Sequence, residues 1–179
     1  MRIEMSFWAA FVMGTAAFII ISWQFSIKAR RYHGIARFFA FESILALFLL
    51  NVGFWFKEPF SFLHIFSWVF LTASLFLAIQ GVYLLGKLGK AEGQFENTTR
   101  LVVRGAYKFI RHPLYGSLAF LGLGIFLKRV MSLTLILVFI DLAAVYLTAR
   151  IEEKEMLARF GDEYAVYMTK TKMFIPFLI

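Results

Sequence analysis

The side chains best suited to chemistry in this sequence lie in its second half, where Arg111 and His112 stand immediately before Pro113 and an apolar stretch follows. Proline is favoured at the first position of a helix, where its missing N–H costs nothing, so a helix is predicted to begin at Pro113. The positive end of that helix, beside two basic side chains, suits a carboxylate or phosphate group. The alternative is that Arg111 and His112 only anchor the helix end among lipid headgroups.

A second group of polar residues is predicted to share one face of the last long apolar helix. At about 100° per residue, one stripe contains Asp141, Val145, Thr148, Glu152, Glu155 and Arg159. An acid in the middle of a membrane helix is costly unless it faces the interior of the bundle or a wet cavity. The stripe therefore predicts an inward-facing polar seam that starts at Asp141.

The elements that must position these residues are membrane helices. Of the 179 residues, 61% are hydrophobic and only 17% charged, and the mean hydropathy is +0.75, whereas a soluble domain averages roughly 45–50% and 25%. A bilayer crossing needs about 20 mostly apolar residues. That length predicts an all-α fold with about five transmembrane helices, at residues 7–27, 38–56, 60–85, 114–127 and 130–149.

The last two predicted helices form a short hairpin, because only Lys128 and Arg129 separate them, and a helical extension follows at the C-terminus. No internal repeat or flexible linker divides the chain, so we expect one membrane domain over residues 1–179. Within it, residues 1–85 form an apolar three-helix scaffold, and residues 86–179 hold a loop, the hairpin and the extension. The first helix is too long for a cleavable signal peptide and is expected to be retained.

The positions of lysine and arginine predict the orientation, because short basic loops stay in the cytoplasm. With the N-terminus outside, fifteen of the 19 basic residues lie on the cytoplasmic side. The four on the outer side are Arg2, Lys57, Lys128 and Arg129. The net charge of +8 is then explained by the orientation of the protein in the membrane. We therefore expect a bilayer and no nucleic acid as partner. The C-terminus and the active site are expected to face the cytoplasm.

Composition disfavours metal and thiol chemistry. The chain has no cysteine, and its three histidines are His33, His64 and His112. Thiolate nucleophiles and zinc-thiolate sites are therefore excluded, and we expect no metal site.

Hairpin geometry predicts where a ligand could bind. Pro113 lies about 15 residues before the hairpin turn and Glu152 about 23 after it, so their heights differ by roughly 12 Å at 1.5 Å per residue. The difference predicts a cavity between Pro113 and the Glu152–Glu153 pair, roofed by residues 86–108. Both a soluble cofactor and a lipid-borne substrate could reach it.

An ordered set of motifs spans roughly residues 80–176. It consists of Gly105-x-Tyr107-x-x-x-Arg111-His112-Pro113-x-Tyr115, then Glu152-Glu153 with Leu157, then Phe160-Gly161-Asp162-Glu163-Tyr164-x-x-Tyr167, and a late Pro176. This set resembles the membrane-embedded isoprenylcysteine carboxyl methyltransferases and their phospholipid methyltransferase relatives. The resemblance implies methyl transfer from S-adenosylmethionine to a lipid or lipid-linked acceptor.

In that family the cofactor is held by the segment before the Arg-His-Pro motif, by the motif itself and by the first glutamate of the pair. The resemblance therefore implies that the cofactor-binding residues are Thr99, Arg100, Leu101, Val102, Tyr107, His112, Pro113, Leu114, Tyr115 and Glu152. We expect His112 to bind the cofactor's carboxylate end and Glu152 its ribose or amino group. The rings of Tyr107 and Tyr115 would lie near the sulfonium, because ring faces attract cations.

The acceptor is less defined. The carboxyl methyltransferases carry a substrate-binding arginine four residues before the first glutamate, whereas this chain has Thr148 there and Arg150 on another helix face. Thr148 and Arg150 are the candidate substrate residues, and a prenylcysteine carboxylate, a phospholipid amine or another lipid nucleophile stays open. A protonated amine would need a general base, for which Asp141 and Glu153 are the candidates.

Two other functions stay open at the level of sequence. A membrane sterol or enone reductase, which uses NADPH, resembles this family around a similar His-Pro-x-Tyr segment, but usually has polar residues after it, where this chain has Leu114, Gly116 and Ser117. A small non-enzymatic carrier could use the Asp141 seam as a polar path.

The two tyrosines of the terminal segment also allow two interpretations. Tyr164 and Tyr167 could pack that segment against the membrane helices, or they could contact a ligand directly.

Overall fold

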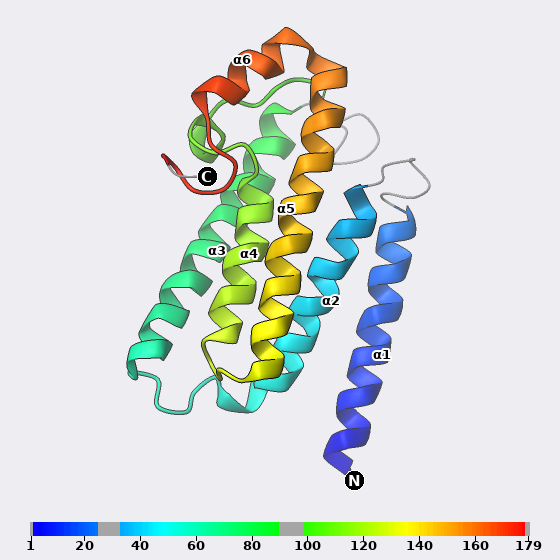
Figure 1. The fold of residues 1–179 in the computed structure, drawn as a ribbon, viewed down its shortest axis with the longest axis vertical. Coiled ribbons are helices and arrows are strands. Elements are labelled where there is room, and N and C mark those ends of the chain that lie inside the picture. Colours follow the sequence, from blue (N-terminus) through cyan, green and yellow to red (C-terminus); the bar gives the residue numbers. More distant parts are fainter. Residues whose placement is uncertain (1, 25–32, 90–98, 178–179) are drawn as a thin grey trace.

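The protein is a bundle of long helices that run roughly side by side (Figure 1). The computed structural model describes residues 2–24, 33–89 and 99–177. Its helices are α1 (Arg2–Ser22), α2 (His33–Asn51), α3 (Phe62–Leu88), α4 (Pro113–Phe126), α5 (Ser132–Phe160) and α6 (Asp162–Lys170), with 3-10 turns η2 (Val52–Phe54) and η3 (Gly105–Lys108). Within these ranges, β-pairing is limited to one isolated bridge, between Ile110 and Lys172. The all-α class is confirmed.

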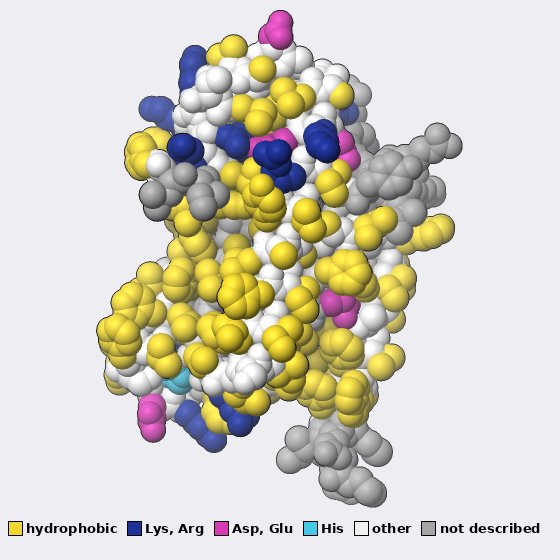
Figure 2. Space-filling model, viewed as in Figure 1, with side chains coloured by type: hydrophobic (Ala, Val, Ile, Leu, Met, Phe, Trp, Pro, Cys, Tyr) yellow, Lys and Arg dark blue, Asp and Glu magenta, His cyan; other side chains and the backbone are white. Residues whose placement is uncertain are grey.

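Three helical stretches are long and apolar enough to cross a membrane, namely His33–Phe54, Phe62–Leu88 and Ser132–Phe160. Two more, Ser6–Ser22 and Pro113–Phe126, are apolar but shorter. Hydrophobic side chains cover the middle of the face shown in Figure 2, and lysine and arginine gather toward its two ends. This surface suits a membrane protein, while the count of five spans and the orientation of the termini stay predictions. The basic residues Lys28, Arg30, Arg31 and Lys90 lie outside the described residues.

Close packing between α3 and α4 positions the start of α4. A Cβ at Gly124 would lie 2.8 Å from Cγ of Leu71 on α3, so the glycine lets the two helices approach. Ser67 donates a hydrogen bond to the carbonyl of Gly124 at 2.6 Å, and Ser74 donates one to the carbonyl of Ser117 at 2.7 Å. Gly124 therefore serves the close packing of α4 against α3.

Helix α2 begins at His33, five residues earlier than predicted, because its first turns carry buried polar side chains instead of loop residues. His33 and Arg37 are only 1% and 7% exposed. Nδ1 of His33 lies 3.0 Å from a carboxylate oxygen of Glu155, which ties the start of α2 to α5. At its other end α2 stops at Asn51, short of the predicted residue 56, and η2 follows.

Helix α5 carries the polar seam and extends well past the predicted span. It continues without a break to Phe160, and Gly161 then adopts φ +53°, a backbone conformation that favours glycine, before α6 begins. Asp141 and Thr148 are fully buried, which confirms that the seam faces inward. Helix α6 and the chain end lie at the end of the bundle opposite the hairpin turn (Figure 1).

Candidate active site

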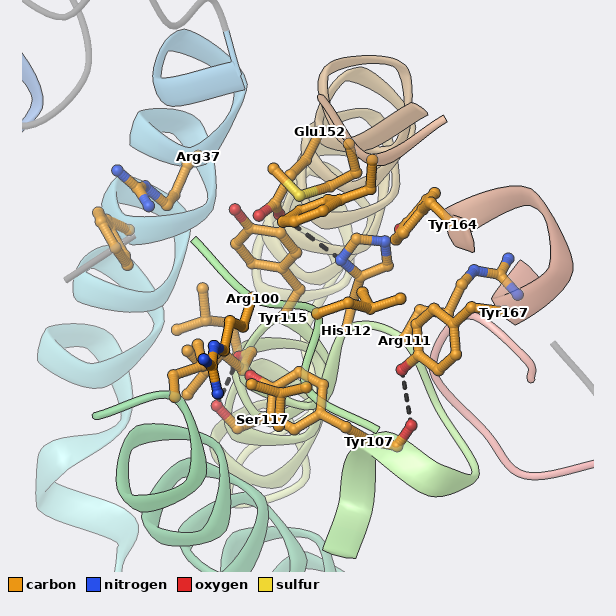
Figure 3. A pocket seen from close by; sticks show the side chains of 18 residues that line it. Arg37, Arg100, Tyr107, Arg111, His112, Tyr115, Ser117, Glu152, Tyr164 and Tyr167 are labelled. Atoms are coloured by element: carbon orange, nitrogen blue, oxygen red, sulfur yellow. Dashed lines mark hydrogen bonds and ion pairs between the residues drawn. The ribbon is translucent and has the colours of Figure 1, made fainter. Parts of the chain in front are cut away.

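A cavity of about 300 Å³ lies at this end of the bundle. Helices α2, α3, α4, α5 and α6 contribute to its walls, together with the segment that precedes α4. The lining residues are Arg37, Phe41, Leu85, Arg100, Leu101, Val102, Tyr107, Arg111, His112, Leu114, Tyr115, Ser117, Leu118, Glu152, Met156, Phe160, Tyr164 and Tyr167. Figure 3 shows the polar members of this set around the cavity.

His112 enters the cavity because α4 begins where the sequence predicted. Pro113 is the first residue of α4, and His112 precedes it with non-helical backbone angles (φ −124°, ψ 61°). Its ring stacks on Tyr115, one turn into the helix, with centroids 5.5 Å apart and planes 24° apart. The imidazole is thus held at the N-terminus of α4.

Two carboxylates from α5 flank this imidazole. Nδ1 of His112 lies 3.6 Å from Glu152 Oε2, and Nε2 lies 3.6 Å from Glu153 Oε1. Burial disfavours the imidazolium, but the nearby carboxylates of Glu152 and Glu153 outweigh it, so the pKa of His112 is raised above its ordinary value. Tyr115 also hydrogen-bonds Glu152. The site therefore favours the imidazolium form of His112 more than water does.

Glu153 is engaged by an arginine of the same motif. Nε of Arg111 donates to Glu153 Oε1 at 2.7 Å, and Nη1 donates to the carbonyls of Thr171 at 2.5 Å and Met168 at 3.3 Å. Both partners of this ion pair are largely buried. Arg111 thus clamps α5 to the chain segment after α6, and Glu153 is not among the residues that line the cavity.

The C-terminal segment pairs with the backbone just before α4. The amide of Arg111 donates to the carbonyl of Lys172 at 2.8 Å, that of His112 to Met173 at 3.1 Å, and that of Lys172 to Phe109 at 3.0 Å. Nothing in the sequence patterns indicated this pairing. It leaves the motif held from both sides, by α4 and by the segment after α6.

The tyrosines of the site are buried and protonated. Burial raises the pKa of Tyr107, Tyr164 and Tyr167. Tyr167 donates its hydroxyl to the carbonyl of Tyr107 at 2.6 Å, which fastens α6 over η3 (Figure 3). Tyr164 and Tyr167 also line the cavity. The two tyrosines can therefore both pack the terminal segment against the bundle and contact a ligand.

Most of the predicted cofactor residues meet at the cavity. Those that line it are Arg100, Leu101, Val102, Tyr107, His112, Leu114, Tyr115 and Glu152. Thr99 and Pro113 are not among the lining residues; the amide of Thr99 donates to the carbonyl of Gly89 at 2.9 Å. Of the predicted roof, residues 90–98 lie outside the described part of the chain.

The candidate base Asp141 and the candidate substrate residues lie away from the cavity lining. Asp141 precedes Glu152 by 11 residues of α5, about 16 Å along the helix, and it packs against Gly122. Thr148 is fully buried and donates to the carbonyl of Ala144 at 2.7 Å. Arg150 has a 55% exposed side chain that lies 3.9 Å from Glu153.

Helix α2 supplies cavity residues that the sequence analysis did not assign to the site. Arg37 and Phe41 line the cavity, and Figure 3 shows Arg37 on the side opposite His112. A charged residue one helical turn before an aromatic one, at the start of an apolar run, was the available signal. It was interpreted instead as part of the basic loop that sets orientation.

The described helices define an all-α protein with three helices long and apolar enough to cross a membrane and with a cavity of charged and aromatic side chains at one end of its bundle. A comparison with protein families refines this class: the phospholipid methyltransferase family model matches residues 62–163, more than half of the chain. The chain therefore belongs to the phospholipid methyltransferase family, which confirms the resemblance seen in its motifs and implies methyltransferase activity. No curated protein and no solved structure matches it significantly.

Proposed function

We propose that this protein transfers a methyl group from S-adenosylmethionine to a lipid or lipid-linked acceptor, in the cavity between α4 and α5. The observation that carries the proposal is that His112 and Glu152, which lie 40 residues apart within the family match, meet in one cavity with Tyr107 and Tyr115. The proposed orientation turns this cavity toward the cytoplasm, where the cofactor is made available.

The residues present fit the cofactor. S-adenosylmethionine carries a carboxylate, an amino group, ribose hydroxyls and a sulfonium. Glu152 offers an acceptor for the amino or hydroxyl groups. Nε2 of His112 is buried and, although it lies 3.6 Å from Glu153, makes no hydrogen bond within the described part of the chain, so it could donate one to a carboxylate. The faces of Tyr107 and Tyr115 suit the sulfonium. The cavity thus contains a charged, polar or aromatic side chain suited to each of these groups of the cofactor.

When bound, S-adenosylmethionine supplies an electrophilic methyl group. The chain's own part is to bind, orient and exclude water. His112 and Glu152 fix the polar ends, and the apolar walls formed by Leu101, Val102 and Met156 keep water from the reacting atoms. Direct displacement needs no covalent bond to the protein, in keeping with the absence of cysteine.

A general base is needed only if the acceptor arrives protonated. The candidates were Asp141 and Glu153, yet neither lines the cavity, and Glu153 already accepts a hydrogen bond from Arg111. We therefore propose that the acceptor reacts without help from Asp141. An Asp141→Asn variant with an unchanged methylation rate would support this, whereas a loss of activity with retained cofactor binding would restore Asp141 as the base.

Ligand-induced thermal stabilisation of the purified protein tests the proposal. S-adenosylhomocysteine should raise the melting temperature, and NADPH should not. Mass spectrometry of lipid extracts from expressing cells should then show a lipid that gains one methyl group. Stabilisation by NADPH alone would favour the reductase, and stabilisation by neither would favour the carrier.

A further inference from the structure

The wall of the cavity opposite His112 and Glu152 carries the positive charge of Arg37, a residue that lies outside the segment matched by the family model. Arg37 of α2 is 7% exposed, and its guanidinium carbon lies 6.0 Å from the centre of the Phe41 ring, one turn further along the helix. Figure 3 shows Arg37 across the cavity from His112. This side of the cavity therefore presents a cation, whereas the α5 side presents the Glu152 carboxylate.

An apolar groove continues from this wall. It encloses about 360 Å³ and has almost entirely apolar walls, with residues from α1, α2 and α4 and from the turn after η2. Phe41 and Leu118 line both the groove and the cavity, so the two hollows share a boundary. Trp55 and Ile125 line the far end of the groove.

Two helical stripes form the shared surface. On α2 the stripe is Arg37, Phe41, Ile44 and Phe48, and on α4 it is Leu114, Leu118, Leu121 and Ile125. Each stripe follows the spacing of one helix face. The first and last residues of each stripe are 11 positions apart, about 16 Å at 1.5 Å per residue, which is roughly half of the 30 Å hydrocarbon core of a bilayer. The surface is thus charged at the end next to the cavity and apolar along the rest of its length, which corresponds to about half of the bilayer core.

We propose that Arg37 and this groove form the acceptor site, in which Arg37 binds the anionic phosphate or carboxylate group of the lipid and the groove holds its tail. Guanidinium binds both of these groups through paired hydrogen bonds. The tail would lie between Phe41 and Leu118 and continue toward Trp55. That this lipid is the methyl acceptor rests on the proposed function; that it binds here does not.

Binding can be measured without catalysis, as thermal stabilisation of the full-length protein in detergent. The probes are dioctanoyl phosphatidylethanolamine for a phosphate, dodecanoate for a carboxylate and dioctanoylglycerol as a neutral lipid. We expect at least one of the two probes that carry an anionic group to stabilise the protein at a concentration about tenfold lower than dioctanoylglycerol, and which of the two does so identifies the group. Equal stabilisation by dioctanoylglycerol, or stabilisation by none of the three, would overturn the proposal.

Substitution of the cation tests its role. Arg37→Gln should weaken binding of the anionic probe about tenfold or more, Arg37→Lys should restore part of it, and Lys154→Gln, at an exposed position of α5, should leave it unchanged. Affinity for S-adenosylhomocysteine should be retained in Arg37→Gln. If that affinity falls instead, Arg37 serves the cofactor and the proposal is wrong.

The groove is tested independently of the charge, so the proposal stays falsifiable if Arg37→Gln does not fold. Leu121→Trp should fill the groove and weaken binding of the eight-carbon lipid several-fold, and Ile136→Trp, on the exposed face of α5, should not. Unchanged lipid binding in a folded Leu121→Trp would overturn the groove as the tail site. Lipid binding without any response to S-adenosylhomocysteine would instead contradict the proposed function and leave this site intact.

Discussion

His112 and Glu152 together determine the charge that the cavity presents. The imidazole lies 3.6 Å from each of two carboxylates, and the Arg111 guanidinium satisfies one of these, Glu153. Glu152 is then the carboxylate that faces the cavity. Arg111 thus neutralises Glu153, and Glu152 is left to interact with a ligand in the cavity.

Glu152→Gln should lower the affinity for S-adenosylhomocysteine about tenfold or more. The substitution keeps the shape of the side chain and removes its charge, and hydrogen bonds to charged groups contribute about 1.5–3 kcal/mol. Titration calorimetry measures the change. Glu163→Gln, the same substitution at an exposed position of α6, is the control. Full affinity in Glu152→Gln would remove the proposed role of Glu152.

Cofactor affinity should depend on pH through His112. Because its pKa in the folded protein is raised above 6.5, the imidazolium persists to a higher pH than in an unperturbed histidine. Its contribution to binding and to stability is present at low pH and is lost as the pH rises through the raised pKa. Titration with S-adenosylhomocysteine from about pH 6 to about pH 10 should show this loss. His112→Gln should flatten the profile, and an unchanged profile in that variant would assign the titration to another group.

The hairpin of α4 and α5 is the element on which the site depends. Gly122 of α4 faces Asp141 of α5, and a Cβ on Gly122 would overlap the carboxylate. Neither carboxylate oxygen has a hydrogen-bond partner in the described part of the chain. The glycine therefore sets how closely α4 approaches α5, and with it the distance across the cavity.

Gly122→Ala should destabilise the protein by about 1–3 kcal/mol, the usual cost of overpacking a tight interior. The added methyl group has no space beside Asp141. A thermal melt in detergent measures the loss, with Gly53→Ala as the control because no atom lies within 4 Å of a Cβ there. The double variant Gly122→Ala with Asp141→Ala should regain part of the stability. Failure of this rescue would show that the overlap is not the cause.

The pairing of the C-terminal segment with the motif makes a separate prediction. Lys172→Pro removes the amide that donates to Phe109, and Thr171 before it already has the extended backbone (φ −130°, ψ 159°) that precedes proline well. We expect a several-fold loss of affinity for S-adenosylhomocysteine. Lys172→Ala, which keeps the amide, should bind normally, since the side chain is exposed. Equal affinities would show that the pairing does not support the site.

Across the whole molecule, α6, whose tyrosines line the cavity, lies at one end of the bundle, and the hairpin turn lies at the other (Figure 1). Lys128 at that turn is buried, with its ammonium 3.4 Å from the centre of the Trp68 ring, so one basic residue assigned to the outer face is held by an aromatic contact. The two ends therefore differ in character. One end holds a charged cavity, and the other holds an aromatic anchor.

Cysteine labelling in intact cells tests the predicted orientation, because the chain contains no cysteine of its own. Lys57→Cys lies between α2 and α3, and Glu163→Cys lies in α6; both positions are exposed. A maleimide that does not cross membranes should label Lys57→Cys from outside and Glu163→Cys only after lysis. The opposite labelling pattern would invert the topology and with it the proposed cytoplasmic access of the cofactor.

Local patterns in the sequence were sufficient to predict much of this architecture. The start of α4 at Pro113, the inward seam from Asp141 to Glu152 and the meeting of His112 with Glu152 follow from helix periodicity, proline geometry and the family motif. Periodicity depends only on residues close together in the sequence, so it can be detected without knowing how the helices pack. The start of α2 was predicted too late, because a buried arginine resembles a loop arginine until its surroundings are known.

By itself, the sequence determined the membrane class, the helical hairpin and the two halves of the motif, because composition and short-range spacing specify them. Only the tertiary structure decided that Arg37 faces the cavity from α2, that Arg111 engages Glu153, and that residues 171–173 pair with the backbone before α4. These contacts join segments far apart in the chain. Such contacts depend on how helices pack against one another, and no local pattern encodes that packing.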